Sequence, residues 1–383
     1  MSFLVSALPP RLMARGKLED RWGEFESPSP VGVILLARGR GGAKACGVAD
    51  GCFSEDADFP DLGESAGVLG LDVREVTSDG RFSVGSDGVR AVAATGDGKV
   101  EFVGFEKHTL AFVTSALGYP AYYPVPSLGE PAAIKAVLMD LDGTTVHSED
   151  FWIWIIEQST ASLLGDRKFQ LEEADVAHVS GHSVSEHLNY CIGKYCPEKT
   201  LEEARRFYFE HTDREMRAIL DGKGRPGAFS PAPGIKEFLH ELKDMGMKLG
   251  LVTSGLYEKA YPEILDVFKT LGMGDPEEFY DSIITAGTAV GRGKAGTMGE
   301  LPPKPHPWLY AESLTIGLGM KFEERNAVIG IEDSGAGICS IRLAGIRSFG
   351  LNDGNIDESG TGGLCQFRVD GFDQIMAEIK ALR

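Results

Sequence analysis

The chain has 383 residues and a formal net charge of −19, with 43% hydrophobic and 25% charged residues. This composition is typical of globular proteins, and the length predicts roughly two or three domains. The large negative charge argues against nucleic acid or an anionic membrane as a main partner, because both attract clustered lysine and arginine. No stretch approaches the ~20 apolar residues of a membrane helix. Six scattered cysteines without metal-ligand spacing indicate free thiols in the cytoplasm.

The first 130 residues alternate short apolar runs with turns rich in aspartate and glycine. The strands that these runs predict are Val31–Ala37, Gly67–Val73, Val89–Ala93 and Val100–Val103. We therefore expect a separate, small β-rich module of unknown role at residues 1–130. The prolines of Tyr119–Pro126 indicate the linker into the second domain.

A nearly uninterrupted apolar run, Ile134–Met139, leads directly into Asp140, Asp142 and Gly143. Such a run is typical of a strand that is covered on both faces in a parallel sheet. Ligands of open parallel sheets bind beyond the carboxyl ends of the strands, so both carboxylates are expected at a reaction centre. The glycine allows the chain to turn sharply and to approach an anion closely.

Helical periodicity follows this motif, and the alternation of strand and helix then returns. The expected helices are Phe151–Leu164, Leu201–Leu220 and Ile235–Met245. The expected strands are Lys248–Val252, Ser282–Thr285, Ala327–Ile331 and Arg347–Leu351. The pattern predicts a doubly wound α/β domain with a parallel sheet at residues 131–383, and a helical cap inserted at about residues 150–228.

Four segments in a fixed order resemble the motifs of the haloacid dehalogenase superfamily, in the branch that carries a helical cap after the first motif. They are Asp140–Thr144, Gly250–Gly255, Lys304–Pro307 and Gly330–Ile338. The resemblance covers about residues 134–383 and implies the Rossmann-like core of that superfamily. Relatives that act on carbon–halogen bonds lack the second aspartate, so the presence of Asp142 implies phosphoryl transfer.

The resemblance also implies a role for each motif. Asp140 would attack phosphorus, and Asp142 would serve as acid and then as base. Lys304 would neutralise the nucleophile and the phosphate. The residues expected to bind the substrate phosphate are Thr253, Ser254 and Gly143.

The implied cofactor is Mg²⁺, which prefers oxygen ligands. Its expected ligands are Asp140, the backbone carbonyl of Asp142, and Asp333. Glu332 is expected either to bind the ion directly or to support its ligands.

Two assignments stay open at the level of sequence. Lys294, in a glycine-rich stretch ten residues before Lys304, is a rival for the third-motif lysine. The cap residues Gly181, His182 and Ser183 resemble a specificity loop, but they do not identify a substrate.

The sequence therefore predicts a Mg²⁺-dependent phosphohydrolase that acts on a small phosphorylated metabolite through an aspartyl-phosphate. The alternatives are a sugar-phosphate mutase, a phosphonate hydrolase or a non-catalytic sensor of a phosphorylated ligand. Mutases of this branch carry an arginine where Val184 stands and a histidine where Trp152 stands, and no cap lysine matches the phosphonate-cleaving relatives. A sensor needs no nucleophile paired with an acid/base.

Overall fold

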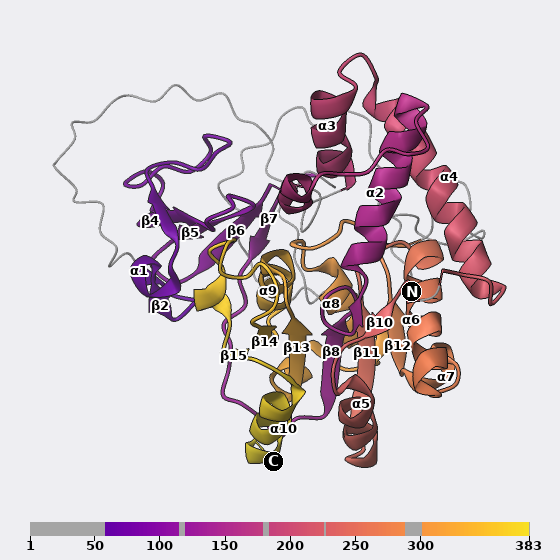
Figure 1. Cartoon of the computed structure of the whole chain (residues 1–383). Helices are drawn as coiled ribbons and strands as arrows, with labels where there is room; N and C mark the ends of the chain where they lie inside the picture. Colours follow the sequence, from indigo (N-terminus) through magenta and orange to yellow (C-terminus); the bar gives the residue numbers. More distant parts are fainter. Residues whose placement is uncertain (1–57, 115–118, 179–183, 226, 288–300, 383) are drawn as a thin grey trace, which may run out of the picture.

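The computed structural model describes residues 58–114, 119–178, 184–225, 227–287 and 301–382. The predicted strand Val31–Ala37 lies outside these residues. Figure 1 shows an N-terminal group of strands, a central sheet flanked by helices, and the helices of the cap at the top of the view.

The N-terminal module is an antiparallel sheet of five strands in the order β3-β4-β5-β6-β7. Its strands are β3 (Asp72–Arg74), β4 (Ala91–Ala94), β5 (Val100–Gly104), β6 (Thr109–Val113) and β7 (Ala121–Pro124). A two-stranded sheet and a short helix precede it: β1 (Asp58–Phe59), β2 (Glu64–Ser65) and α1 (Ala66–Leu69). The β-rich prediction is confirmed for the described part of the module.

Two local predictions in this module are wrong. Gly67–Val73 is not one strand, because α1 occupies its first part and Gly70 ends that helix in the left-handed conformation. The expected linker Tyr119–Pro126 contains β7, which pairs with β6 as an edge strand. Tyr122 and Tyr123 of β7 are both buried on opposite faces, so the prolines flank a strand rather than forming a free connection.

The second domain has a parallel sheet of six strands in the order β12-β11-β8-β13-β14-β15. These strands are β12 (Ser282–Ile284), β11 (Lys248–Val252), β8 (Ala136–Asp140), β13 (Val328–Glu332), β14 (Arg347–Leu351) and β15 (Phe367–Val369). The order runs outward from β8 in both directions, which is the doubly wound arrangement. The predicted fold class is confirmed.

The two faces of this sheet bury alternate residues of each strand. Val137 and Met139 face one apolar core, shared with α5 (Ile235–Asp244), α6 (Tyr257–Leu271) and α10 (Phe372–Ala381). Leu138 faces a second core, which is covered by α8 (Trp308–Glu312), α9 (Gly335–Leu343) and the N-terminal module. Shorter elements complete the domain: α7 (Pro276–Phe279), a π-helical turn (Ser313–Gly317) and 3-10 turns at Phe322–Ala327 and Gly362–Leu364.

The cap consists of α2 (Glu149–Leu164), α3 (Val184–Tyr195), α4 (Leu201–Leu220) and a 3-10 turn at Glu173–His178. α4 begins with a capping box in which Thr200 and Glu203 satisfy each other's backbone amides. The chain enters the cap through β9 (Val146–His147) and leaves it through β10 (Ser230–Pro231), and these two strands pair. Because α4 also contacts α6, the cap lies against the domain that contains the parallel sheet.

Candidate active site

Three neighbouring strands of the parallel sheet end at the candidate site. β8 ends at Asp140, and β11 ends beside it because Val252 is the register partner of Asp140. β13 ends at Glu332 on the other side of β8. Thr253 and Asp333 follow β11 and β13 directly. Motifs that are far apart in the chain therefore converge at one edge of the sheet.

The Lys304 ammonium lies between two of the carboxylates. Its Nζ contacts Asp140 Oδ1, lies 2.5 Å from Glu332 Oε1 and donates to the Val252 carbonyl at 3.1 Å. The Lys304 side chain is only 6% exposed. Burial lowers the pKa of this lysine, but the two carboxylates outweigh burial and raise it above its usual value. Lys304 is therefore charged at neutral pH.

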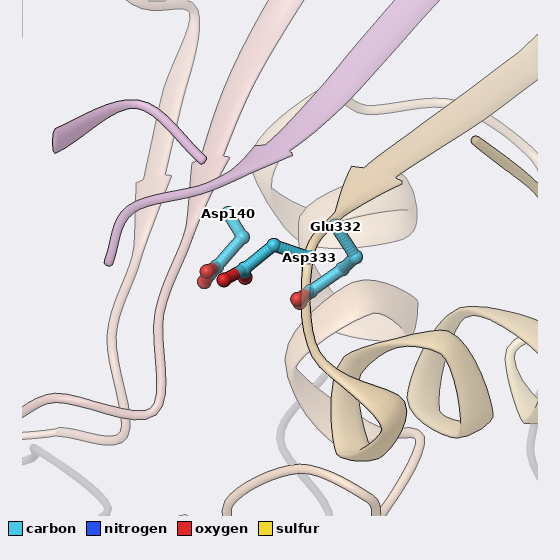
Figure 2. Close-up of side chains that lie close together, drawn as sticks. All are labelled: Asp140, Glu332 and Asp333. Carbon is cyan, nitrogen blue, oxygen red and sulfur yellow. The ribbon is translucent and has the colours of Figure 1, made fainter. Parts of the chain in front are cut away.

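Asp140, Glu332 and Asp333 form a compact acidic trio, whose side chains Figure 2 shows converging. One oxygen of each lies within 4.8 Å of the others. Burial, followed by the charge of Glu332, raises the pKa of Asp140 well above its usual range and that of Asp333 to about 7. Lys304 opposes both shifts but does not cancel them. Oxygen donors with excess negative charge suit a hard divalent cation, so the trio fits such an ion.

Both oxygens of Glu332 already have partners in the protein. Tyr310 donates to Oε1 at 2.8 Å, beside the Lys304 contact, and Ser334 donates to Oε2 at 3.0 Å. Ser334 also accepts from the Gly337 amide and so caps α9. A Cβ at Gly337 would lie 1.9 Å from the Glu332 carboxyl carbon, so the first turn of α9 is packed against this carboxylate. The other two acids of the trio are the more available cation ligands.

Gly143 has a φ of +80° and lies under the Asp333 carboxylate. A Cβ at this position would come within 2.1 Å of Asp333 Oδ2, so only glycine permits this approach. The Gly143 amide donates to the Val146 carbonyl at 2.8 Å. Its expected role in phosphate binding stays a prediction.

Asp142 lies apart from the trio, where the cap meets the core. Ser148 donates to its Oδ1 at 2.5 Å, and Lys259 Nζ lies 3.5 Å from its Oδ2. Lys259 also lies 3.8 Å from Glu263 Oε1 and 4.1 Å from the centre of the Trp152 ring. Trp152 donates to Glu263 Oε1 at 2.7 Å. Burial, followed by the charge of Asp142, raises the pKa of Glu263 well above its usual range.

The hydroxyl residues of the second motif flank the lysine. Thr253 is buried, and its Oγ1 accepts from the Gly255 amide at 2.9 Å. Ser254 is exposed, and its Oγ accepts from the Lys304 amide at 3.1 Å. Both residues directly follow β11, whose last residue is the register partner of Asp140, and their role in binding a substrate phosphate stays a prediction.

Several predicted residues lie outside the described part of the chain. Gly181, His182 and Ser183 of the expected specificity loop belong to this group, and so does Lys294, the rival of Lys304.

Sequence reasoning did not identify Tyr310, Ser148 or Lys259 as parts of the site. Lys259 and Glu263 stand four residues apart on α6, directly after the second motif. Paired charges on a helix usually indicate a solvated face. The sequence alone therefore did not indicate that Trp152 of the cap covers the Lys259–Glu263 pair. Tyr310 stands six residues after Lys304. Its contact with Glu332 depends on how α8 packs, which the sequence does not show.

The sequence profile of a family described as haloacid dehalogenase-like hydrolase matches residues 137–351. This match spans more than half of the chain, and the chain belongs to that family. It is therefore an enzyme of the hydrolase class.

The chain is also similar to several individual proteins. The validoxylamine A 7′-phosphate phosphatase of Streptomyces hygroscopicus subsp. limoneus is 29% identical over 229 residues, which cover 57% of this chain and 85% of the relative. A predicted phosphoglycolate phosphatase from Haemophilus somnus 129pt is 18% identical, with a TM-score of 0.48 over 64% of this chain and 98% of its own. CbbY from Rhodobacter sphaeroides, in complex with phosphate, is 20% identical, with a TM-score of 0.46 over 64% of this chain and 99% of its own.

Among the described residues, no helix combines the length and the apolar character needed to span a bilayer.

Proposed function

We propose that this protein is a Mg²⁺-dependent phosphohydrolase that transfers the phosphoryl group of a small phosphorylated metabolite to Asp140 and then to water. The observation that carries the proposal is the buried Lys304 ammonium, held between Asp140 and Glu332 and next to Asp333. This arrangement places a carboxylate nucleophile, the fixed ammonium of Lys304 and carboxylate oxygens that can bind a metal ion at one edge of the sheet.

In the first step, a carboxylate oxygen of Asp140 forms a bond to phosphorus, and the bond from phosphorus to the leaving oxygen breaks. Asp142 gives its proton to that oxygen, so the product leaves as an alcohol. Thr253 and Ser254 donate hydrogen bonds to the phosphoryl oxygens. Lys304 offsets the charge that Asp140 and the phosphoryl group bring together.

In the second step, water attacks the phosphorus of the aspartyl-phosphate. Asp142, now ionised, takes a proton from this water, and the bond between phosphorus and the Asp140 oxygen breaks. Inorganic phosphate leaves, and the free Asp140 carboxylate is restored. One group can act as acid and then as base because its protonation state alternates between the two steps.

Asp140, Asp333 and the backbone carbonyl of Asp142 are the proposed ligands of Mg²⁺. A bound Mg²⁺ would neutralise phosphoryl oxygens and help align the phosphoryl group with the nucleophile. We assign Glu332 to the support of Lys304, because its oxygens already accept from Lys304, Tyr310 and Ser334.

Hydrolysis is favoured over the mutase reaction. A mutase must retain its phosphorylated sugar and return the phosphoryl group to it, and the cap positions that would carry the arginine and histidine are Val184 and Trp152. Trp152 is engaged with Glu263 and Lys259. The relative named for a 7′-phosphate substrate supports a phosphate ester as the substrate.

We propose a cytoplasmic location. Four cysteines among the described residues are free thiols, which suits a reducing compartment: Cys191, Cys196, Cys339 and Cys365.

Phosphate release from 4-nitrophenyl phosphate tests the reaction class. The wild-type protein should release phosphate with Mg²⁺ and lose this activity in excess EDTA. A panel of phosphorylated metabolites then tests the substrate class. Absence of turnover across the panel and the aryl phosphate, in protein that binds Mg²⁺, would favour the sensor alternative.

A further inference from the structure

The segment that carries Lys304 is held from two sides. Lys304 and Tyr310 face the site, where they contact Asp140 and Glu332. Two of the five residues between them, His306 and Trp308, contact Tyr123 of the N-terminal module. One short stretch of chain therefore touches both the acidic trio and a sheet outside the family's matched region.

The contact on the module's side is one buried hydroxyl, that of Tyr123 on β7. It lies 2.8 Å from His306 Nδ1 and accepts from Trp308 Nε1 at 3.2 Å. Tyr123 is 2% exposed and His306 is fully buried. Two directional hydrogen bonds to residues of the segment that carries Lys304 fix the position of this segment more tightly than apolar packing alone.

The protonation states of this pair are set by their surroundings. Burial lowers the pKa of His306 to about 4, so its ring is neutral at pH 7. Burial also raises the pKa of Tyr123 to about 12, against the opposing Trp308 bond, so its hydroxyl is protonated. Trp308 can only donate, which leaves the Tyr123 proton for His306 Nδ1. The hydroxyl thus both accepts and donates, and phenylalanine cannot replace either bond.

The module is anchored close to this contact. Arg342 of α9 is buried and donates to the carbonyls of Pro126 and Asp61. His306 is fixed from a second direction, because Ser340 of α9 donates to its carbonyl at 2.7 Å. The β7 strand therefore cannot move away from the lysine segment without breaking bonds to α9.

We propose that Tyr123 is a positioning residue for Lys304. Through Tyr123, the N-terminal module holds the segment that carries Lys304 in place. The inference rests on the proposed function, because it takes Lys304 to be the catalytic lysine. It assigns a role to a module that lies outside residues 137–351, the region that the family profile matches.

The neighbouring tyrosine offers a matched control. Tyr122 is also buried on β7, and its hydroxyl donates to Asp79 Oδ1 at 2.9 Å inside the module. Tyr122→Phe and Tyr123→Phe each remove one hydrogen-bonded hydroxyl from the same strand. Only the second loses a contact with the lysine segment.

The experiment compares the full-length wild type with both variants in kcat and KM for 4-nitrophenyl phosphate and in thermal unfolding. Tyr123→Phe should lower kcat about tenfold, the effect of losing a buried bond that fixes a catalytic group, with KM changed less than about twofold. Tyr122→Phe should keep kcat within about twofold of the wild type. Trp308→Phe, which loses the donor to the same hydroxyl, should lower kcat in the same direction as Tyr123→Phe.

Equal losses of kcat in the two tyrosine variants, or an unchanged kcat in Tyr123→Phe, would overturn the inference. Binding of inorganic phosphate with Mg²⁺, measured by calorimetry, gives a second readout that needs no turnover, and weaker binding only in Tyr123→Phe supports the inference. If Lys304→Ala loses activity while Tyr123→Phe does not, the proposed function stands and the inference alone fails. If Lys304→Ala is fully active, the inference fails because Lys304 is not the catalytic lysine, and the proposed function is then decided by the loss of turnover in Asp140→Asn.

Discussion

Asp140 and Asp142 are two residues apart but have different surroundings. The Asp140 side chain is 8% exposed and touches Lys304, whereas that of Asp142 is 34% exposed and touches Ser148 and Lys259. A buried carboxylate fixed by a cation suits attack on phosphorus. A more accessible carboxylate with hydrogen-bonding neighbours suits exchange of protons with a leaving group and with water.

Changing Asp140 or Asp142 to asparagine should have different effects on turnover and on the phosphorylated intermediate. Asp140→Asn should show no turnover and no covalent phosphate, because the nucleophile is gone. Asp142→Asn should lower turnover by at least ~100-fold. With an activated aryl phosphate it should accumulate phosphorylated Asp140, because the base for hydrolysis is missing. Mass spectrometry of acid-quenched protein measures the adduct, and its absence from Asp142→Asn would contradict the covalent route.

Asp333 and Glu332 are adjacent acids with different expected functions. Asp333→Asn should raise the Mg²⁺ concentration for half-maximal activity by about tenfold, since it loses a proposed ligand. Glu332→Gln should mainly lower kcat, because Lys304 loses a charged partner. Calorimetric titration with Mg²⁺ checks the first effect without turnover. If Glu332→Gln weakened Mg²⁺ binding as much as Asp333→Asn, Glu332 would be a direct ligand.

The third-motif lysine can be tested directly against its rival. Lys304→Ala should reduce kcat by about 100-fold, the scale of losing one preorganised electrostatic group. Lys294→Ala should cost far less. Kinetics of both variants with one aryl phosphate decide between them, and a larger loss for Lys294→Ala would assign the motif to the earlier lysine.

At the scale of elements, the surroundings of Asp142, the proposed acid/base, depend on the contact between α6 and the cap helix α2. Lys259 of α6 reaches Asp142, while Trp152 of α2 covers this ammonium and donates to Glu263. Burial lowers the pKa of Lys259, but Asp142 and Glu263 outweigh burial and raise it, so the lysine stays charged. We therefore expect the Lys259 ammonium to hold the Asp142 carboxylate in position only while Trp152 of the cap covers it.

Lys259→Met should therefore act mainly on the step that needs a proton donor. We expect kcat/KM to fall about tenfold for an alkyl phosphate and about twofold for 2,4-dinitrophenyl phosphate, whose leaving group needs little protonation. Lys243→Met is the control, because it removes a lysine 2.7 Å from Asp281, a residue with no part in the proposed mechanism. Equal losses on both substrates would show that Lys259 does not act through Asp142.

The elements of the catalytic domain were largely predictable because their patterns are local. The bounds expected for Leu201–Leu220, Lys248–Val252 and Arg347–Leu351 coincide with α4, β11 and β14. β15 was missed, because its three residues, Phe367–Val369, are too short to show a period. In the site, Asp140, Thr253 and Asp333 were predictable from their places at the ends of strands, whereas Lys304 was predicted from the family resemblance of its segment. The contacts of Lys259 with Asp142 and of Tyr123 with His306 were not, because each joins elements whose packing has no sequence signature.

At the scale of the whole molecule, the N-terminal module and the catalytic domain share an apolar core. Phe102 and Tyr123 of the module belong to the same buried cluster as Leu309 and Ile338 of the catalytic domain. A second cluster, containing Val92 and other residues of the module's sheet, lies within the module alone. Separate folding units would each bury their own cores, so the shared cluster couples the two parts in stability.

We therefore expect the full-length protein to unfold in one calorimetric transition. Arg342→Met should lower the free energy of unfolding by about 2 kcal/mol, because the partly buried carbonyls of Pro126 and Asp61 lose their donor. Val92→Ala, within the module's own cluster, should shift the same transition, because a defect on one side destabilises the whole cooperative unit. Two resolved transitions, with Val92→Ala moving only one of them, would show that the module is an independent domain and that its contact with Lys304 is not maintained by a common fold.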